Sequence, residues 1–213
     1  MSKAKTIKFF GTTFQAISAY AAGLTITGVT NASPAVVTSV AHGLASNDIV
    51  RVAGVVGLTD LNGKNYVVTV LTADTFELVN SDTTNADTYT SGGTAAKATL
   101  SGSCQLTGST HGSGSTSEIS TETNCGITKD FGSPDDGQAT FSFNYAPGDF
   151  MTALESSRTN VTETALVTTL PSAAGIMVDI GVVVTVGRDG SAGGVWTGSA
   201  TLTRTQARVD LEV

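Results

Sequence analysis

Apolar and polar side chains alternate along several stretches of this chain, and a period of two restricts those stretches to β-strands with one buried face. The clearest runs cover Gln138–Tyr145 and Ile176–Val186, and a third covers 207–213. Strands that bury one face and leave the other wet are typical of antiparallel sheets, so the sequence predicts a mainly β protein. In the second run the expected buried face carries Ile176, Val178, Ile180, Val182, Val184 and Val186.

One short helix is expected within this β-rich chain. A turn and a capping carboxylate at Asp149 precede three apolar residues at helical spacing, Phe150, Met151 and Leu154, and the pattern ends near Arg158. Three apolar side chains cannot hold an isolated helix in water. We therefore expect these three residues to pack the helix on a sheet, as a structural lid on the core.

Residues 26–97 are expected to form a separate unit of short strands joined by tight turns. The Asn62-Gly63 pair predicts a type I′ hairpin turn, because both residues accept positive φ angles. The stretch 80–94 is rich in Ser, Asp, Asn, Thr and Gly, which favours a loop that returns the chain to a host domain. Such strands make a small barrel or sandwich. They are expected at 35–40, 48–53, 65–70 and 75–79.

Four segments of this unit carry a family resemblance, namely Ser33–Thr38, Ala41–Leu44, Asp60–Gly63 and Thr75–Leu78. The unit is similar to a β-rich module that recurs in phage structural proteins, and to the first catalytic-cysteine half-domain of ubiquitin-activating enzymes. The resemblance implies a small β-barrel fold. It implies no thioester chemistry, because residues 26–97 contain no cysteine.

Outside that unit, an ordered set of patterned segments carries a second resemblance. The segments are Ser117–Cys125, Lys129–Phe131, Asp136–Gly137, Thr140–Pro147, Ile176–Val186 and Gly193–Val209. Together they resemble the tail tube protein, or major tail protein, of long-tailed (siphovirus-like) bacteriophages. The family pattern is a strand pair, a long loop, a strand that runs into a helix, and final hairpins.

The resemblance implies a discontinuous tail-tube β domain made of residues 1–25 and 98–213, a β-barrel or sandwich with one short α-helix. The unit 26–97 would then be an inserted β-barrel module on the tube exterior. The implied function is structural: homohexameric rings stack into the tail tube, the conduit for the tape-measure protein and the genome DNA. Tail tip and terminator proteins are further expected partners. The expected location is the virion tail, assembled in the bacterial host cytoplasm.

The polar segment from Ser109 to Gly137 is expected to be one long loop, and loops of that length are usually functional or disordered. We expect it to order when it meets the next subunit or the next ring, with charged rim contacts around apolar anchors. The rim candidates are Glu118, Glu122, Lys129, Asp130, Asp135 and Asp136, and the anchor candidates are Ile119, Ile127 and Phe131.

The formal net charge of −7 disfavours a protein that grips nucleic acid through its phosphates. Residues 1–25 carry +3, residues 26–97 carry −3 and residues 98–213 carry −7. An acidic wall repels DNA and lets it slide through a tube. The alternative is that the acidic surface serves solubility alone.

No catalytic residue, cofactor or metal is predicted. The segment Asp189–Gly193 lacks the first glycine of a nucleophile elbow and is expected to be a hairpin loop. Two cysteines, Cys104 and Cys125, and two histidines, His42 and His111, lack the spacing of a zinc site, and whether the cysteines pair stays open. No run of about 18 apolar residues predicts a membrane span.

A second class of function is compatible with the same amino-acid composition. A virion-decoration or cell-surface protein with two β modules, binding a glycan or protein ligand, would also be rich in Thr, Ser and Gly. Against it, Trp196 is the only tryptophan and the four tyrosines are scattered, so no aromatic platform is evident. An enzyme is disfavoured further, because the sequence has no cluster of titratable residues.

Overall fold

The computed structural model describes residues 9–103, 105–112, 114, 118–123, 126–131, 136–171 and 174–212, with 118–123 and 126–131 described as backbone. Within them the chain is mainly β with one α-helix, as predicted. The elements are β1 (Thr13–Thr25), β2 (Gly28–Val29), β3 (Ala35–Thr38), β4 (Ile49–Val56), a 3₁₀ turn η1 (Thr59–Leu61), β5 (Asn65–Val70), β6 (Thr75–Leu78), β7 (Ser91–Ser103), β8 (Leu106–His111), β9 (Glu118–Thr123), β10 (Gly126–Phe131), β11 (Gln138–Asn144), α1 (Asp149–Asn160), β12 (Thr164–Thr169), β13 (Ile176–Asp189), β14 (Thr197–Arg204) and β15 (Val209–Leu211).

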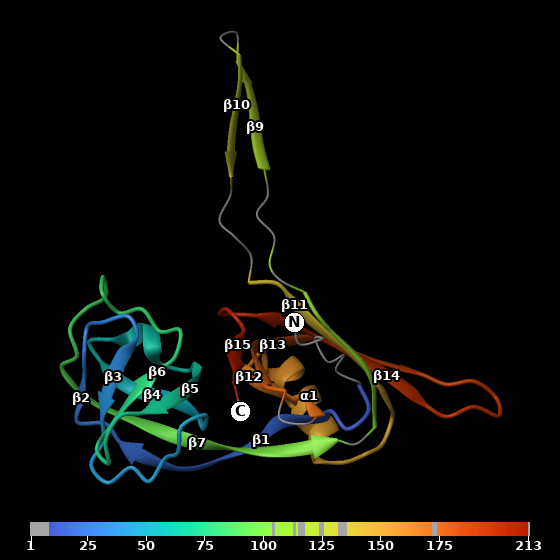
Figure 1. The fold of residues 1–213 in the computed structure, drawn as a ribbon, viewed down its shortest axis with the longest axis horizontal. Coiled ribbons are helices and arrows are strands. Elements are labelled where there is room, and N and C mark those ends of the chain that lie inside the picture. Colours follow the sequence, from blue (N-terminus) through green and yellow to red (C-terminus); the bar gives the residue numbers. More distant parts are fainter. Residues whose placement is uncertain are drawn as a thin grey trace, which may run out of the picture.

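Most strands join one large antiparallel sheet that is not closed into a barrel. Its order is β2-β3-β6-β5-β4-β7-β1-β12-β13-β14-β11-β8, and β15 pairs with β13 beside this path. The strands of the predicted module, β2 to β6, stand at one end of the order and appear as the blue-green lobe in Figure 1. The barrel or sandwich architecture expected from the family resemblances is therefore observed as one continuous antiparallel sheet, open rather than closed, in the described chain.

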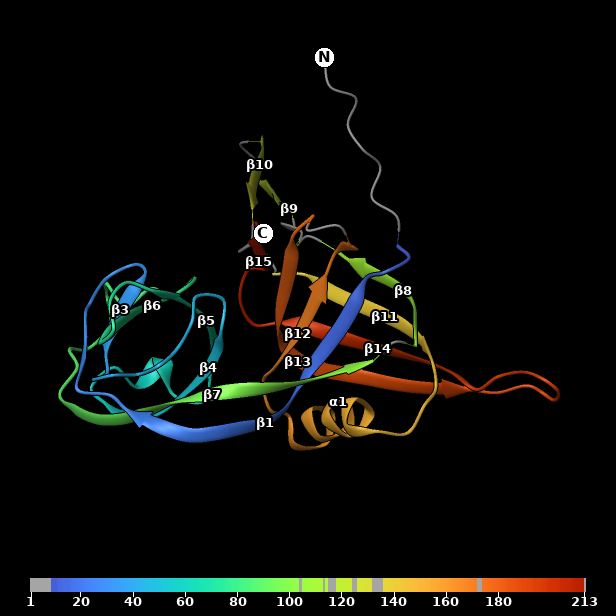
Figure 2. The same ribbon diagram turned by 60° about the horizontal axis from the view of Figure 1, so that its bottom comes forward.

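Two long strands, β1 and β7, connect the two lobes (Figure 2). They pair antiparallel from Phe14 opposite Ser103 to Thr25 opposite Thr94. Two bulges in β1 interrupt the register, and bulges increase local twist and bend a strand. At one end β1 pairs with β12, and at the other end β7 pairs with β4. The same two strands therefore belong to both lobes.

Three apolar clusters form the interior. One lies wholly within the module and contains Phe76 and Leu78 among its members from Ile26 to Ala95. A second lies in the other lobe and is centred on phenylalanine side chains. The third combines Ile49 and Val67 of the module with strands of the other lobe, so it packs one lobe onto the other. The second cluster comprises Phe14, Ala16, Ala139, Phe141, Phe143, Phe150, Met151, Leu154, Leu166, Val183, Ala200 and Leu202.

Helix α1 lies against the sheet with the three predicted apolar residues, Phe150, Met151 and Leu154, buried in the second cluster. The Phe150 ring stands edge-on to Phe14 and Phe143, with centroids 6.4 and 6.3 Å apart. Burial of each such side chain contributes about 1.5–3 kcal/mol, which offsets the weak intrinsic stability of a twelve-residue helix.

The single buried face predicted for 176–186 is wrong in its second half. Val178 and Ile180 are buried as expected, but Val183 is buried at 1% exposure while Val184 is 48% exposed. Alternation is unbroken from Val178 to Val183, so Val183 lies on the opposite face from Val178 and Ile180, and the register shift comes only after it, between Val183 and Thr185. β13 therefore sends Val178 and Ile180 into the third cluster and Val183 into the second, on the opposite face of the strand.

The type I′ turn predicted at Asn62-Gly63 is also wrong. Asn62 has φ −69° and ψ 136°, and only Gly63 has a positive φ. The Asn62 carboxamide instead pairs with the main chain of Val55: it accepts the Val55 N–H and donates to the Val55 carbonyl, both at 2.8 Å. The side chain thus takes the place of a neighbouring strand where the β4–β5 ladder ends.

Substitution Asn62→Ala is expected to lower the free energy of unfolding by about 1–3 kcal/mol, because it leaves the peptide groups of buried Val55 unpaired. Urea denaturation of the full chain measures the loss. Asn85→Ala, on an exposed loop of the same module, is the matched control and should change stability by less than about 0.5 kcal/mol. Equal effects of the two substitutions would show that the Asn62 contacts add no stability.

Candidate functional site

The predicted subunit-contact segment is largely a hairpin arm, which we define as β9 and β10 with their stems. The two strands pair from Glu118 opposite Phe131 to Thr123 opposite Gly126. Figure 1 shows them standing apart from both lobes, and among the described residues they hydrogen-bond only to each other. The expectation of one continuous loop from Ser109 to Gly137 is therefore wrong, since polar residues at 118–123 and 126–131 form a ladder.

Seven of the predicted contact residues lie on this arm. In β9, Ile119 and Glu122 stand opposite Asp130 and Ile127 of β10. Asp136 is exposed at the second stem, and Asp135 lies outside the described residues, as do Cys104 and Cys125. The seven are Glu118, Ile119, Glu122, Ile127, Lys129, Asp130 and Phe131.

Both stems of the arm are held by one arginine, Arg204, at the end of β14. Its Nη1 donates to the carbonyl of Gly112, which precedes the arm, and at 3.0 Å to the carbonyl of Asp136, which comes after it. Its backbone N–H donates to the Gly137 carbonyl at 3.1 Å. One buried guanidinium therefore joins the chain entering the arm to the chain leaving it.

The charge of Arg204 is balanced by Asp179 on β13, whose side chain is fully buried. Arg204 Nε donates to Asp179 Oδ1 at 2.6 Å, and His111 Nδ1 lies 2.7 Å from Oδ2 of the same carboxylate. The His111 ring stands edge-on to Phe141 with a centroid distance of 5.6 Å, which places this polar group directly beside the second cluster. We call Asp179, Arg204 and His111 the arm-root triad.

A buried ion pair of this kind is weak evidence for added stability, but its hydrogen bonds fix the orientation of the segments that it joins. Taking two charges out of water costs several kcal/mol for each ion, and the attraction between them repays it only with good geometry. Arg204 adds main-chain partners to its ion pair, so the bonds of its Nη1 also set where the arm leaves the sheet, while its buried Nη2 has no partner within the described chain. Loss of either partner leaves a buried charge without compensation.

Sequence reasoning did not find this triad. Asp179 is the only charged residue in the apolar run from Ile176 to Val186, and a charge at such a position is the signal that could have pointed to a buried pair. Its partner could not be read from the sequence, because Arg204 and His111 are 25 and 68 residues away along the chain.

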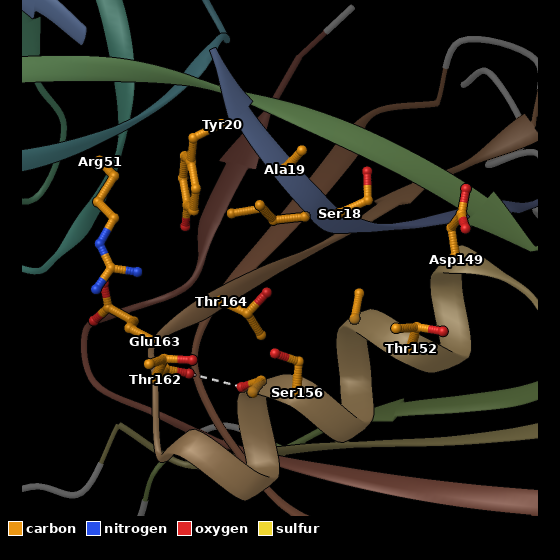
Figure 3. Close-up of a pocket in the computed structure, with 13 residues that line it drawn as sticks. Ser18, Ala19, Tyr20, Arg51, Asp149, Thr152, Ser156, Thr162, Glu163 and Thr164 are labelled. Carbon is orange, nitrogen blue, oxygen red and sulfur yellow. Dashed lines mark hydrogen bonds between the residues drawn. The ribbon is translucent and has the colours of Figure 1, made fainter. Parts of the chain in front are cut away.

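A second feature lies at the junction of the two lobes, where a cleft of about 470 Å³ opens between α1, β1 and β4 (Figure 3). Its walls are mostly hydroxyl groups, with Tyr20 and Arg51 at the module end; the guanidinium carbon of Arg51 lies 5.6 Å from the centre of the Tyr20 ring. Glu163 is partly exposed there, and its carboxylate accepts hydrogen bonds from the Asn65 N–H and the Thr205 hydroxyl.

Comparison with known families gives one match. Residues 32–98 match the family model of the ubiquitin-activating enzyme E1 FCCH domain, which confirms the resemblance expected for the module at 26–97. The matched region is a small β module, and the match does not extend to the helix, the arm or the arm-root triad. A comparison with curated proteins finds no match.

Two further observations concern the described part of the chain. It contains no group of three or more His, Cys, Asp or Glu side chains arranged to hold a metal ion. No helix in it has the length and apolar character needed to cross a membrane.

Substitution Asp179→Asn is expected to lower the free energy of unfolding by about 3–5 kcal/mol, because the buried Arg204 guanidinium loses its counter-charge. Asp210→Asn is the matched control. It removes the partner of Arg208 in an ion pair whose side chains are 32% and 58% exposed, and such pairs contribute about 0–1 kcal/mol. Thermal unfolding compares the two, and equal losses would contradict the structural role of the triad.

Proposed function

We propose that this chain is a structural subunit of the tail tube of a long-tailed bacteriophage. In this proposal six copies form a ring, and rings stack into a tube through which the tape-measure protein and the genome DNA pass. Tail tip and terminator proteins would bind the two ends of the tube. The protein would be assembled in the bacterial host cytoplasm and would reside in the virion tail, without an enzymatic activity of its own.

The observation that carries the proposal is the hairpin arm with its buried root. A two-stranded hairpin is at best marginally stable by itself in water, and this one has no strand neighbour within the described chain. Yet its stems are held by a desolvated ion pair. An arm whose stems are held at the sheet, and whose strands have no further strand neighbour in the described chain, suits docking against another copy, which would supply that neighbour.

The ends of the sheet support self-assembly as well. β8 and β2 are the terminal strands of the hydrogen-bonded order, so each has a neighbour on one side only among the described strands. Unpaired edges invite association, and a closed ring satisfies them by pairing copies edge to edge. The acidic surface fits a tube that must not hold DNA by its phosphates.

The module would project from the tube exterior, where it blocks neither the lumen nor stacking. The third cluster makes it an integral part of the subunit, because Ile49 and Val67 are buried against the other lobe. Removing the whole module would expose that cluster, so surface substitutions are the better test of its position.

Deletion of 115–135 tests the role of the arm. It joins Gly114 to Asp136, and because β8 and β11 already pair with each other, a short turn can close the gap. We expect the variant to remain folded, to form monomers or rings, and to form no tubes under conditions in which the intact chain does. Negative-stain electron microscopy and sedimentation velocity give the readout. Tubes of normal length from the deletion variant would refute the role of the arm.

A triple substitution to serine of the anchor candidates Ile119, Ile127 and Phe131 tests the same contact without shortening the chain. We expect it to reduce tube formation at least tenfold, because these are the apolar side chains on the arm. The matched control replaces Val40, Val56 and Leu71, which are 72%, 52% and 49% exposed on the module, and should assemble normally. If the module triple stops assembly while the arm triple does not, the two surfaces have been assigned the wrong way round.

The alternative function is a virion-decoration or cell-surface β module that binds a glycan or protein ligand. The junction cleft favours it, since a hydroxyl-lined cleft with an aromatic ring and a guanidinium group offers both donors and acceptors to a sugar. Glycan-array binding by a chain that stays monomeric at all concentrations, abolished by Tyr20→Ala, would favour this alternative over the tail tube.

A further inference from the structure

A smaller pocket, of about 130 Å³, lies between the module and the other lobe, and it differs in character from the junction cleft. Glu163 belongs to both, but the remaining lining residues come from η1, from the start of β5, and from the segments 80–82 and 205–206. The lining residues are Asp60, Leu61, Lys64, Tyr66, Asn80, Ser81, Asp82, Glu163, Thr205 and Gln206.

Tyr66 is the buried side chain of this pocket whose polar group is unpaired, because the hydroxyl of the other buried one, Ser81, donates to the Leu78 carbonyl. Tyr66 is 4% exposed and packs in the module cluster, while its hydroxyl has no hydrogen-bond partner within the described chain. Burial, followed by the charges of Glu163 and Asp60, raises the pKa of the phenol, so the hydroxyl is neutral near pH 7 and keeps its oxygen lone pairs. The hydroxyl oxygen itself keeps contact with solvent, so it is open to water or to a ligand in the pocket.

Part of the neutral donor capacity around the pocket is used inside the protein. Asn80 Nδ2 donates to the Ala207 carbonyl, Gln206 Nε2 donates to the Asn65 carbonyl, and the Thr205 hydroxyl donates to Glu163. The carbonyl oxygens of the two amide side chains have no partner within the described chain. Each amide therefore uses one of its two N–H donors inside the protein and keeps its oxygen available as an acceptor.

Three carboxylates add negative charge to these acceptors. Asp60 is exposed and makes no hydrogen bond within the described chain, and each Glu163 oxygen, having two lone pairs, can accept one bond more than it does. Hydrogen bonds from the hydroxyl and the N–H of Thr84 lower the pKa of Asp82 and keep it ionised. Lys64 also lines the pocket, but it is exposed and lies within 4 Å of no described carboxylate oxygen, so its ammonium group makes no ion pair with these three carboxylates.

We propose that this pocket binds a primary ammonium group, which donates its three N–H bonds to the Tyr66 hydroxyl and to the carboxylates of Glu163 and Asp60, with the side-chain carbonyls of Asn80 and Gln206 as neighbouring acceptors. Acceptors outnumber free donors, and the charge is negative, so a cationic donor is the complementary chemistry. The pocket volume suits an alkylammonium chain and excludes a larger folded ligand. This assignment is independent of tube assembly.

An ammonium group could come from a lysine side chain of another protein copy or from a free polyamine. The two share the terminal group and differ at the other end of the alkyl chain. A lysine brings a peptide backbone, while a diamine brings a second cation that the carboxylate of Asp82 could meet. Nα-acetyl-lysine amide and cadaverine are therefore the probes that separate the sources.

Saturation-transfer difference NMR on the full-length protein tests the site with butylammonium chloride at constant ionic strength. We expect saturable binding, with tetramethylammonium at least tenfold weaker because it has the charge but no N–H donor. Tyr66→Phe and Asp60→Asn should each weaken butylammonium binding about tenfold, the loss expected for one hydrogen bond to a charged group. Asp87→Asn, an exposed carboxylate of the same module outside the pocket, is the matched control and should leave binding unchanged.

Two results would overturn the proposal: no saturable binding of butylammonium, or equal binding of butylammonium and tetramethylammonium, which would indicate attraction to the acidic surface alone. Unchanged binding in Asp60→Asn would do the same, and this exposed position keeps the test valid if Tyr66→Phe fails to fold. If butylammonium binds saturably, tighter binding of cadaverine than of Nα-acetyl-lysine amide would identify a polyamine as the source of the ammonium group. The reverse order would identify a lysine side chain.

Discussion

The pairing of β1 with β7 is the interaction on which the rest of the structure depends. Each strand is thirteen residues long and has one part in each lobe, so the module is attached by two hydrogen-bonded strands rather than by a flexible linker. Two bulges let β1 serve the second and third clusters near its start and the module near its end. The paired strands β1 and β7 also set the position of the two pockets between the lobes, because they bring β4 and β5 against the start of β12.

At the opposite side of the second lobe, the arm-root triad solves a different problem. A hairpin that has no further strand neighbour in the described chain cannot fix its own direction by sheet pairing. Arg204 supplies direction by binding main-chain carbonyls on both stems, and Asp179 makes a buried guanidinium tolerable. Burying these charges costs free energy, and the hydrogen bonds that result fix the direction of the arm. For this reason we assign the proposed function to the arm.

The proposed roles of the two lobes are physically compatible. Docking through an arm and through sheet edges uses backbone groups and polar rims, whereas the junction of the two lobes offers pockets whose walls are complete within one chain. An ammonium pocket at the lobe junction could receive a small molecule or a neighbouring lysine without altering the arm. The FCCH-like fold of 32–98 contributes walls and a rigid frame to this junction and brings no cysteine chemistry with it.

Local sequence patterns determined which segments of this protein form the strand β11, the helix and the module. Alternation in Gln138–Tyr145 predicted β11, helical spacing after Asp149 predicted α1, and the composition of 26–97 marked the module, because strand and helix periods are local properties of a sequence. Tertiary structure decided the rest. The burial of Val183 on the face opposite Val178 and Ile180, the hydrogen bonds of the Asn62 amide to Val55, and the meeting of Asp179 with Arg204 all depend on which strands become neighbours. Contacts between residues far apart in the chain leave no periodic signal, and only the folded sheet brings them together.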